Sequence, residues 1–161
     1  MTEPIVRTAA RILVVDPADR LLLYAARDPA GGRVLWFVPG GAVEPGESLF
    51  EAAQRELAEE AAGVSIASFD GPVWRWRHQF NWNGRRIDQT DYFFVARAES
   101  ALDETSIRVG GDEQQYFVAA RWAAIDKLPA PTEIIAPRRL AELLPPILAG
   151  EFPAEPIEVR R

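Results

Sequence analysis

The segment "VWRWRHQFNWNGRRIDQTDYFFVAR", residues 73–97, constrains the fold more than any other part of the chain. Large and polar side chains alternate along both halves of it, and Asn83-Gly84 lies between the halves. Alternation is typical of a strand with two different faces, and Asn-Gly is the preferred two-residue turn of a β-hairpin. The sequence therefore predicts a long hairpin, and with it a β-sheet. The first strand should present the following side chains on one face: Trp74, Trp76, His78, Phe80 and Trp82.

Residues 48–62 form the clearest helical segment. Ser48 and Glu51 match a capping box, in which each side chain bonds a backbone N–H of the other residue. Gly63 suits the left-handed residue that often ends a helix. We expect Leu49, Phe50, Ala53, Leu57 and Ala61 to form the apolar stripe that packs on the sheet.

The rest of the pattern adds strands and a second helix. Residues 11–27 are expected to form two strands around a turn at 16–19, and a C-terminal helix is expected within 132–150, interrupted near Pro145-Pro146. Further strands are expected at 34–39 and 116–125. We predict one domain over 1–161 with α/β or α+β layers and a short tail from about residue 151.

Composition narrows the class of protein. The chain has 161 residues, enough for one domain with a proper core. It has no cysteine, which removes disulfides and thiolate metal sites and fits a cytoplasmic location. We identify no signal peptide and no apolar run of the roughly 18 residues that would span a membrane. The net charge of −6 argues against a nucleic-acid backbone as the main ligand.

Three glutamates lie at an unfavourable place on the 48–62 helix. Glu56, Glu59 and Glu60 are helix neighbours, so their charges repel one another. They also lie near the C-terminal end, where the helix dipole favours cations. A solvated acidic face is the simpler interpretation. However, the glycine-rich loop at Gly40 and Gly41 enters the same helix, and a hard divalent cation suits such oxygen ligands.

The segment from Gly41 to Glu60 resembles the signature of the Nudix hydrolases. That signature is Gly, five residues, Glu, seven residues, then Arg-Glu-apolar-x-Glu-Glu-x-Gly-apolar. Here Gly41 is followed by "AVEPG" and Glu47, and Glu47 by "SLFEAAQ" and "RELAEE". The final glycine comes one residue late, at Gly63, so we expect a helix end that is longer by one residue.

The resemblance implies a fold and an activity. The fold is an α/β/α sandwich with a mixed sheet, in which the signature helix and a C-terminal helix cover the strands. The activity is metal-dependent hydrolysis of the diphosphate linkage in a nucleoside diphosphate joined to another group. The implied cofactor is Mg²⁺, with Mn²⁺ as an alternative, and the implied partner is a small nucleotide-type substrate.

The resemblance also assigns roles to residues. Glu56 and Glu60 are implied as the main metal ligands, together with the carbonyl of Gly40 just before Gly41. Glu59 is implied as a ligand or as the base that removes a proton from water, and Glu47 as the partner that steadies Arg55. Glu113, in "GGDEQQ", is a further candidate acid from a later loop, although a solvated acid is the simpler interpretation there.

The aromatic face of the hairpin has two interpretations. Trp76 and its neighbours could stack a nucleobase, or they could pack in the core or against a second copy in a homodimer. We favour packing, and we expect His78 to be a packed strand residue. Arg27 could reach a phosphate or lie on the surface. The residues that mark substrate subclasses are absent, so no substrate is named.

Two alternatives to the enzyme remain. A Nudix-fold sensor would bind a nucleotide without cleaving it, but the intact "RELAEE" favours turnover. The isopentenyl diphosphate isomerase branch resembles an enzyme with a catalytic cysteine, and this chain has none.

Overall fold

A computed structural model of the protein describes residues 2–100, 116–128 and 134–160. The predicted strands and helices occur in the predicted order, but the structure adds short strands in the loop predicted at 40–47 and at the start of the segment predicted as the C-terminal helix. The strands are β1 (Ile5–Val15), β2 (Leu21–Arg27), β3 (Val34–Phe37), β4 (Gly40–Ala42), β5 (Ile66–Trp82), β6 (Arg85–Ala98), β7 (Phe117–Ala123), β8 (Ile134–Ala136) and β9 (Ile157–Glu158). The helices are α1 (Leu49–Glu60) and α2 (Leu140–Leu148), with a short 3-10 turn, η3 (Ile125–Lys127).

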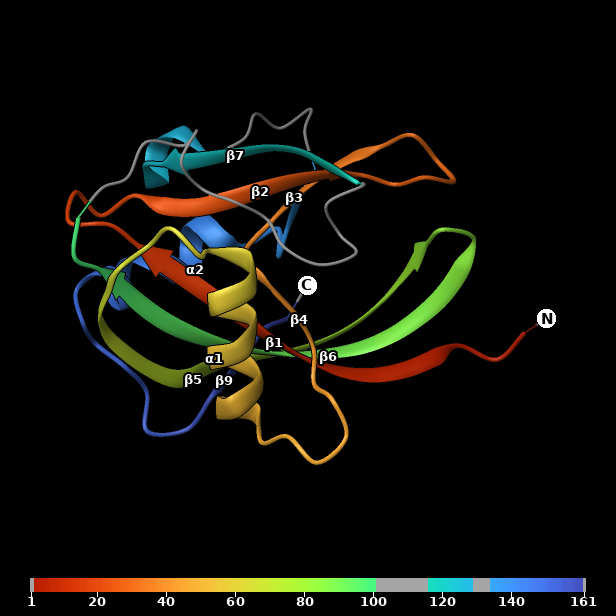
Figure 1. The fold of residues 1–161 in the computed structure, drawn as a ribbon, viewed down its shortest axis with the longest axis horizontal. Helices are drawn as coiled ribbons and strands as arrows, with labels where there is room; N and C mark the ends of the chain where they lie inside the picture. Colours follow the sequence, from red (N-terminus) through yellow and green to blue (C-terminus); the bar gives the residue numbers. More distant parts are fainter. Residues whose placement is uncertain (1, 101–115, 129–133, 161) are drawn as a thin grey trace.

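The strands form a mixed sheet in the order β8-β3-β2-β1-β6-β5-β9, with β4 also paired to β1 and β7 to β2. At its centre, β1 runs parallel to β6 from Ile5 opposite Ile87 to Val15 opposite Arg97. The β5–β6 hairpin and the N-terminal half of β1 extend together away from the other strands (Figure 1). Strand β1 begins at Ile5, whereas the sequence predicted a strand only from residue 11. The first half of β1 was missed because it is stabilised by pairing with β6, which is distant in the sequence.

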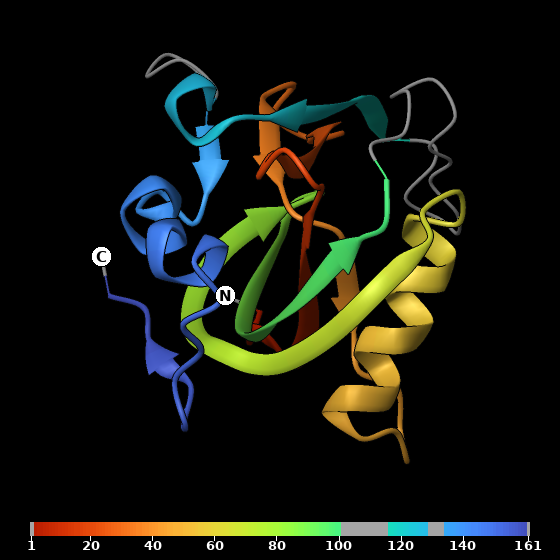
Figure 2. The ribbon, with the colours of Figure 1, turned by 90° about the vertical axis from the view of Figure 1, so that its left-hand side faces the viewer.

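The two helices lie on opposite sides of the strands (Figure 2), which confirms the predicted α/β/α sandwich. Alternate residues of each strand therefore enter different cores. On the α1 side, Ile12 and Phe94 pack with Ala52 and Ala53. On the α2 side, the buried cluster contains the following residues among others: Leu13, Trp74, Phe93, Leu140, Leu144 and Ile147.

The predicted hairpin is confirmed. Asn83 and Gly84 both have positive φ, 50° and 73°, as the favoured hairpin turn requires. The backbone N–H of Asn83 donates to Oδ1 of Asp28 at 3.2 Å, which ties the tip of the hairpin to the loop after β2. The turn at 16–19 is also confirmed, with Asp19 N–H donating to the Asp16 carbonyl at 3.0 Å.

Helix α1 has the predicted start and a different buried face. The capping box of Ser48 and Glu51 is present. The helix ends at Glu60 and not at residue 62. Phe50 was expected in the buried stripe but is 47% exposed, because α1 approaches the sheet closely through the small residues Ala52 and Ala53. Glu56 and Glu60 are also buried on this side, beside the partly buried Leu49 and Leu57.

The C-terminal region differs from the prediction in two ways. Helix α2 runs through Pro145 and Pro146 without the expected interruption. Each interior proline costs about 3 kcal/mol, and burying Leu140, Leu144 and Ile147 at about 1.5–3 kcal/mol each offsets that cost. The segment after residue 151, predicted as a tail, contains β9, which pairs with β5 in parallel. None of the helices in the described ranges is long and apolar enough to cross a bilayer.

Candidate active site

Strand β4, which contains Gly40 and Gly41, packs against α1. A Cβ atom at Gly41 would stand 2.5 Å from Oε1 of Glu56, so a larger residue there would displace this carboxylate. At Gly40, φ is +148° and a Cβ would lie 2.1 Å from the Ala10 carbonyl oxygen. Gly40 is therefore required by its close approach to the backbone of β1, and Gly41 lets the strand lie against an acidic side chain.

Arg55 is the centre of the polar contacts at this place. Its Nε donates to Oε2 of Glu47 at 2.7 Å, and its Nη1 donates to Oε1 of Glu56 at 2.8 Å. Nη1 also lies 3.4 Å from Oε2 of Glu59. Nη2 donates to the Ala42 carbonyl at 3.0 Å and to Oε1 of Glu47 at 2.9 Å. One guanidinium thus joins the loop, the strand β4 and the helix.

The charge states of the pair at the base of this network are well defined. The hydrogen bond from Arg55, followed by the one from the Glu44 backbone N–H, lowers the pKa of Glu47 from 4.5 to about 2. The same bond to Glu47 raises the pKa of Arg55 above its usual value. Glu47 is therefore a permanent anion at neutral pH and holds Arg55, as the sequence predicts.

The three helix glutamates are not equivalent. Glu56 is 7% exposed and shares Nη1 of Arg55 with Glu59, whose side chain is 48% exposed. Glu60 is 3% exposed, and the Tyr24 hydroxyl donates to its backbone carbonyl. Burial, and then the negative charge of Glu60, raise the pKa of Tyr24. The structure thus brings Glu56 and Glu59 together and buries Glu60 beside Tyr24.

The donor atoms here suit a hard divalent cation in kind. Glu56, Glu59, Glu60 and the Gly40 carbonyl offer only oxygen, which Mg²⁺ prefers. The absent Cβ of Gly41 leaves the Glu56 carboxylate against the strand, close to the Gly40 peptide. Within the described part of the chain, however, no three acidic or histidine side chains are already gathered in an arrangement that could hold an ion. A cation at this place would compete with Arg55 for Glu56 and Glu59.

The family model for the NUDIX domain matches residues 6–144, which include all of these groups. The chain belongs to the Nudix hydrolase family. The prediction from the signature is therefore confirmed at the level of the family.

Two curated relatives and one solved structure illustrate the similarity. RNA pyrophosphohydrolase from Afipia carboxidovorans is 32% identical over 135 residues, covering 76% of this chain and 80% of that protein. RNA pyrophosphohydrolase from Rhodopseudomonas palustris is 33% identical over 111 residues, and the match covers 64% of each protein, less than two thirds of the relative's length. The crystal structure of a MutT NUDIX hydrolase from Burkholderia pseudomallei has a TM-score of 0.61 and 27% identity, covering 84% of this chain and 95% of that one.

The aromatic face of the Nudix hairpin is a column of stacked rings. The Trp76 and His78 rings lie 3.6 Å apart at 4°, and the His78 and Phe80 rings lie 5.1 Å apart at 16°. Both faces of the His78 ring are therefore covered, and Trp76 packs partly against the α2-side core. The geometry favours the packing interpretation over base stacking, and His78 is a packed strand residue as expected.

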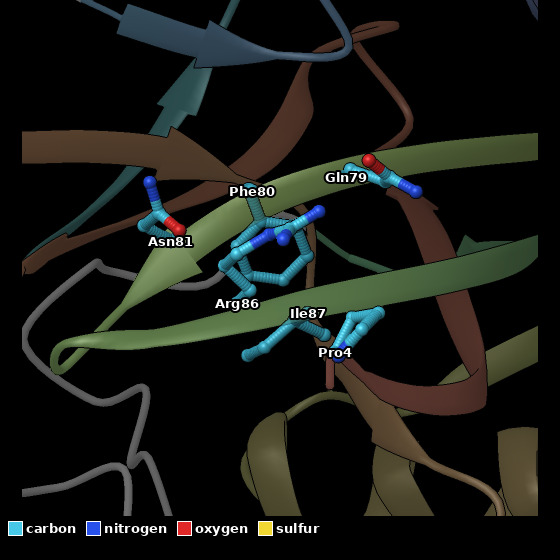
Figure 3. Close-up of a pocket in the computed structure, with 6 residues that line it drawn as sticks. All are labelled: Pro4, Gln79, Phe80, Asn81, Arg86 and Ile87. Atoms are coloured by element: carbon cyan, nitrogen blue, oxygen red, sulfur yellow. The ribbon is translucent and has the colours of Figure 1, made fainter. Parts of the chain in front are cut away.

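Two candidate residues remain. Nη1 of Arg27 donates to the Gly32 carbonyl at 2.7 Å, so this side chain closes the loop after β2. Glu113 lies outside the described residues. A cavity of about 180 Å³ lies at the outer end of the hairpin, and Arg27 does not line it (Figure 3). Its lining consists of Pro4, Gln79, Phe80, Asn81, Arg86 and Ile87.

A polar cluster on the α2-side face of the sheet was missed by the sequence analysis. We call it the Arg11 cluster, and its members are Arg7, Arg11, His78, Gln89 and Asp91. A signal for it exists in the sequence, because apolar residues alternate along β6 at Ile87, Phe93 and Val95 while Gln89 and Asp91 occupy the same face. Polar residues inside an apolar alternation mark a buried site that needs partners.

Proposed function

We propose that the protein is a metal-dependent hydrolase that cleaves the diphosphate linkage of a nucleoside diphosphate joined to another group. The observation that carries this proposal is the Arg55 network, in which one guanidinium holds Glu47, Glu56 and Glu59 against the strand that contains Gly40 and Gly41. Family membership supports the same activity. A protein that only binds a nucleotide has no need to retain this whole set of residues.

In the proposed site, Glu56 and Glu60 hold the cation together with the Gly40 carbonyl. When bound, Mg²⁺ or Mn²⁺ neutralises phosphate oxygens and lowers the pKa of a bound water. Glu59 is exposed enough to act as a further ligand or as the base that accepts a proton from the attacking water. Arg55 orients Glu56 and Glu59, and Glu47 keeps Arg55 in place.

We propose a small nucleotide derivative as the substrate. The net charge of −6 opposes long contacts with a nucleic-acid backbone. The relatives from Afipia and Rhodopseudomonas are named for action on RNA, so the 5′ end of an RNA belongs among the substrates to be compared. A homodimer and a cytoplasmic location stay predictions.

A turnover screen tests the proposal. The purified protein is incubated with Mg²⁺ or Mn²⁺ and with nucleoside triphosphates, nucleotide sugars, ADP-ribose, dinucleoside polyphosphates and a 5′-triphosphate RNA. We expect cleavage of a diphosphate linkage in at least one class, and loss of about 100-fold or more in kcat for Glu56→Gln and Glu60→Gln. Glu51→Gln is the matched control, because Glu51 lies on the same helix and serves only the capping box.

Two results would contradict the proposed activity or the assigned ligands. If no substrate is cleaved with either metal while a nucleotide binds tightly, the sensor alternative is correct. If cleavage occurs and Glu60→Gln retains full activity and full stabilisation by Mg²⁺, the assigned ligands are wrong and the acidic face is a solvated surface.

A further inference from the structure

The Arg11 cluster is held together by a continuous chain of hydrogen bonds. Arg7 Nε donates to the Gln89 side-chain carbonyl, and Gln89 Nε2 donates to Oδ1 of Asp91 at 2.7 Å. His78 Nε2 lies 2.7 Å from Oδ2 of the same carboxylate. Arg11 Nε lies 3.4 Å from Oδ1. These groups come from three neighbouring strands, β1, β6 and β5.

Asp91 is the buried anchor of the cluster. It is 2% exposed, and a carboxylate so far from water is costly unless donors surround it. Burial alone raises its pKa, but the Arg11 charge and the His78 hydrogen bond outweigh burial and hold the pKa below its usual value. Asp91 is therefore an anion whose position is determined by donors on several sides, and it fixes the Arg11 guanidinium in turn.

Arg11 extends from this anchor to the proposed active site. Its Nη1 lies 3.2 Å from the carbonyl oxygen of Gly40, the oxygen proposed to ligate the cation. Its guanidinium carbon also lies 5.9 Å from the centre of the Phe37 ring, which limits its movement on that side. A permanent positive charge is thus held next to the place where a divalent cation would bind.

The Arg11 guanidinium and a divalent cation beside the same carbonyl oxygen would repel each other, and an anion that contacts both would offset this repulsion. The diphosphate of the substrate has the charge and the oxygens to satisfy both, since a guanidinium presents its N–H groups in a fork that matches phosphate oxygens. The Gly40 backbone has little room to move, because it pairs with β1 and Ala10 and Arg11 pack closely against it.

We propose that Arg11 binds the diphosphate group of the substrate beside the Gly40 carbonyl, and that Asp91, His78 and Gln89 are positioning residues for its guanidinium. This inference rests on the proposed function, because it takes the Gly40 carbonyl as the mark of the diphosphate site. It adds a contact from the opposite side of β4 to the groups supplied by α1.

A binding experiment separates Arg11 from the catalytic machinery. Methylenediphosphonate, which cannot be hydrolysed, is titrated by calorimetry into the protein in excess Mg²⁺, and Mn²⁺ is titrated alone into the metal-free protein. We expect Arg11→Gln to weaken diphosphonate binding about 10-fold or more while Mn²⁺ binding stays the same or becomes tighter, because a neighbouring positive charge has been removed. Asp91→Asn should weaken diphosphonate binding in the same direction.

The chain supplies matched controls on the same two strands. Arg77 and Asp88 form a similar pair at 2.9 Å on the other face of β5 and β6, away from the Arg11 cluster. Arg77→Gln and Asp88→Asn should leave both titrations at the parent values. Arg11→Lys, which retains the charge, should recover part of the diphosphonate affinity, and this variant serves if Arg11→Gln does not fold.

Two outcomes overturn the inference. If Arg11→Gln binds diphosphonate as tightly as the parent, Arg11 does not touch the substrate. If it weakens Mn²⁺ as much as diphosphonate, Arg11 serves only the Gly40 carbonyl. Because these titrations need no turnover, a failure of the proposed hydrolysis leaves them interpretable, and active enzyme with an indifferent Arg11 would reject this inference alone.

Discussion

Arg55 and Arg11 both donate to carbonyl oxygens of the short strand β4, yet they are held in different ways. Arg55 reaches Ala42 from the α1 side at 3.0 Å, and Arg11 reaches Gly40 at 3.2 Å. Of the carboxylates around Arg55, those of Glu44 and Glu59 are exposed, whereas that of Glu56 is buried. The carboxylate that holds Arg11 is buried.

This difference in burial indicates that Arg11 is held in a fixed position, whereas Arg55 can exchange some of its partners. Exposed ion pairs are weak and rearrange easily, because water and salt screen them. A buried carboxylate with several donors cannot lose any one of them without a large penalty. The half-exposed Glu59 can therefore leave Arg55 for a cation, whereas the Arg11 cluster holds its guanidinium still.

The largest expected effect comes from Arg55→Gln. Without its guanidinium, Glu47, Glu56 and Glu59 lose their common partner, and we expect kcat to fall about 100-fold or more. The free energy of unfolding should fall by about 1–3 kcal/mol, the cost of leaving partly buried acceptors without a donor. Steady-state kinetics and urea denaturation measure the two effects.

Arg139→Gln is the control for this prediction, since Arg139 pairs with Glu142 at 2.9 Å on an exposed helix end. It should change neither quantity measurably. An Arg55→Gln enzyme with parental kcat would show that the Arg55 network is not part of catalysis.

A smaller effect is expected from Trp76→Ala, which removes the ring stacked on His78 of the Arg11 cluster. Since Trp76 is only partly buried, we expect a loss of about 2 kcal/mol in stability, below the roughly 3–5 kcal/mol of a fully buried tryptophan. Thermal denaturation measures it, with the exposed Phe50→Ala as a milder comparison. If Trp76 instead stacks a nucleobase, nucleotide binding will weaken while diphosphonate binding and melting stay unchanged.

The smallest effect concerns pH and the Arg55 network. The folded pKa of Glu47, about 2, lies below the ordinary 4.5, so its contribution to stability is complete above about pH 4.5 and is lost as pH falls toward 2. In Glu47→Gln, the melting temperature should therefore fall less steeply between about pH 5 and pH 3. Glu151→Gln removes the same charge from an exposed position and should keep the parental slope.

The two networks also differ in how far the sequence predicts them. Glu47, Arg55, Glu56 and Glu59 lie within one loop and helix, and the resemblance to the Nudix signature implied the pairing of Glu47 with Arg55. Arg11 and Asp91 are 80 residues apart and meet only because β1 pairs with β6. No periodicity predicts that register, so the sequence analysis identified the first network and missed the second.

The secondary structure was likewise predictable where it depends on residues close together in the sequence. The hairpin and the capping box depend on adjacent residues, and both form as expected. Phe50 and the continuous α2 were predicted incorrectly, because they depend on how closely a helix approaches its neighbours. The burial of apolar side chains of α2 offsets the cost of its two prolines. The small residues Ala52 and Ala53 let α1 approach the sheet closely, and Phe50 remains partly exposed.

The central position of β1 has a consequence for the newly made chain. This strand pairs with its sequence neighbour β2 only at Val15 and Leu21, but with β6 along its whole length. The apolar half of β1 therefore leaves the ribosome long before its main partner exists. At about 5–20 residues per second, the delay is roughly 4–16 s. During synthesis, the strand that later holds Arg11 is the part of the chain most open to association with other nascent chains.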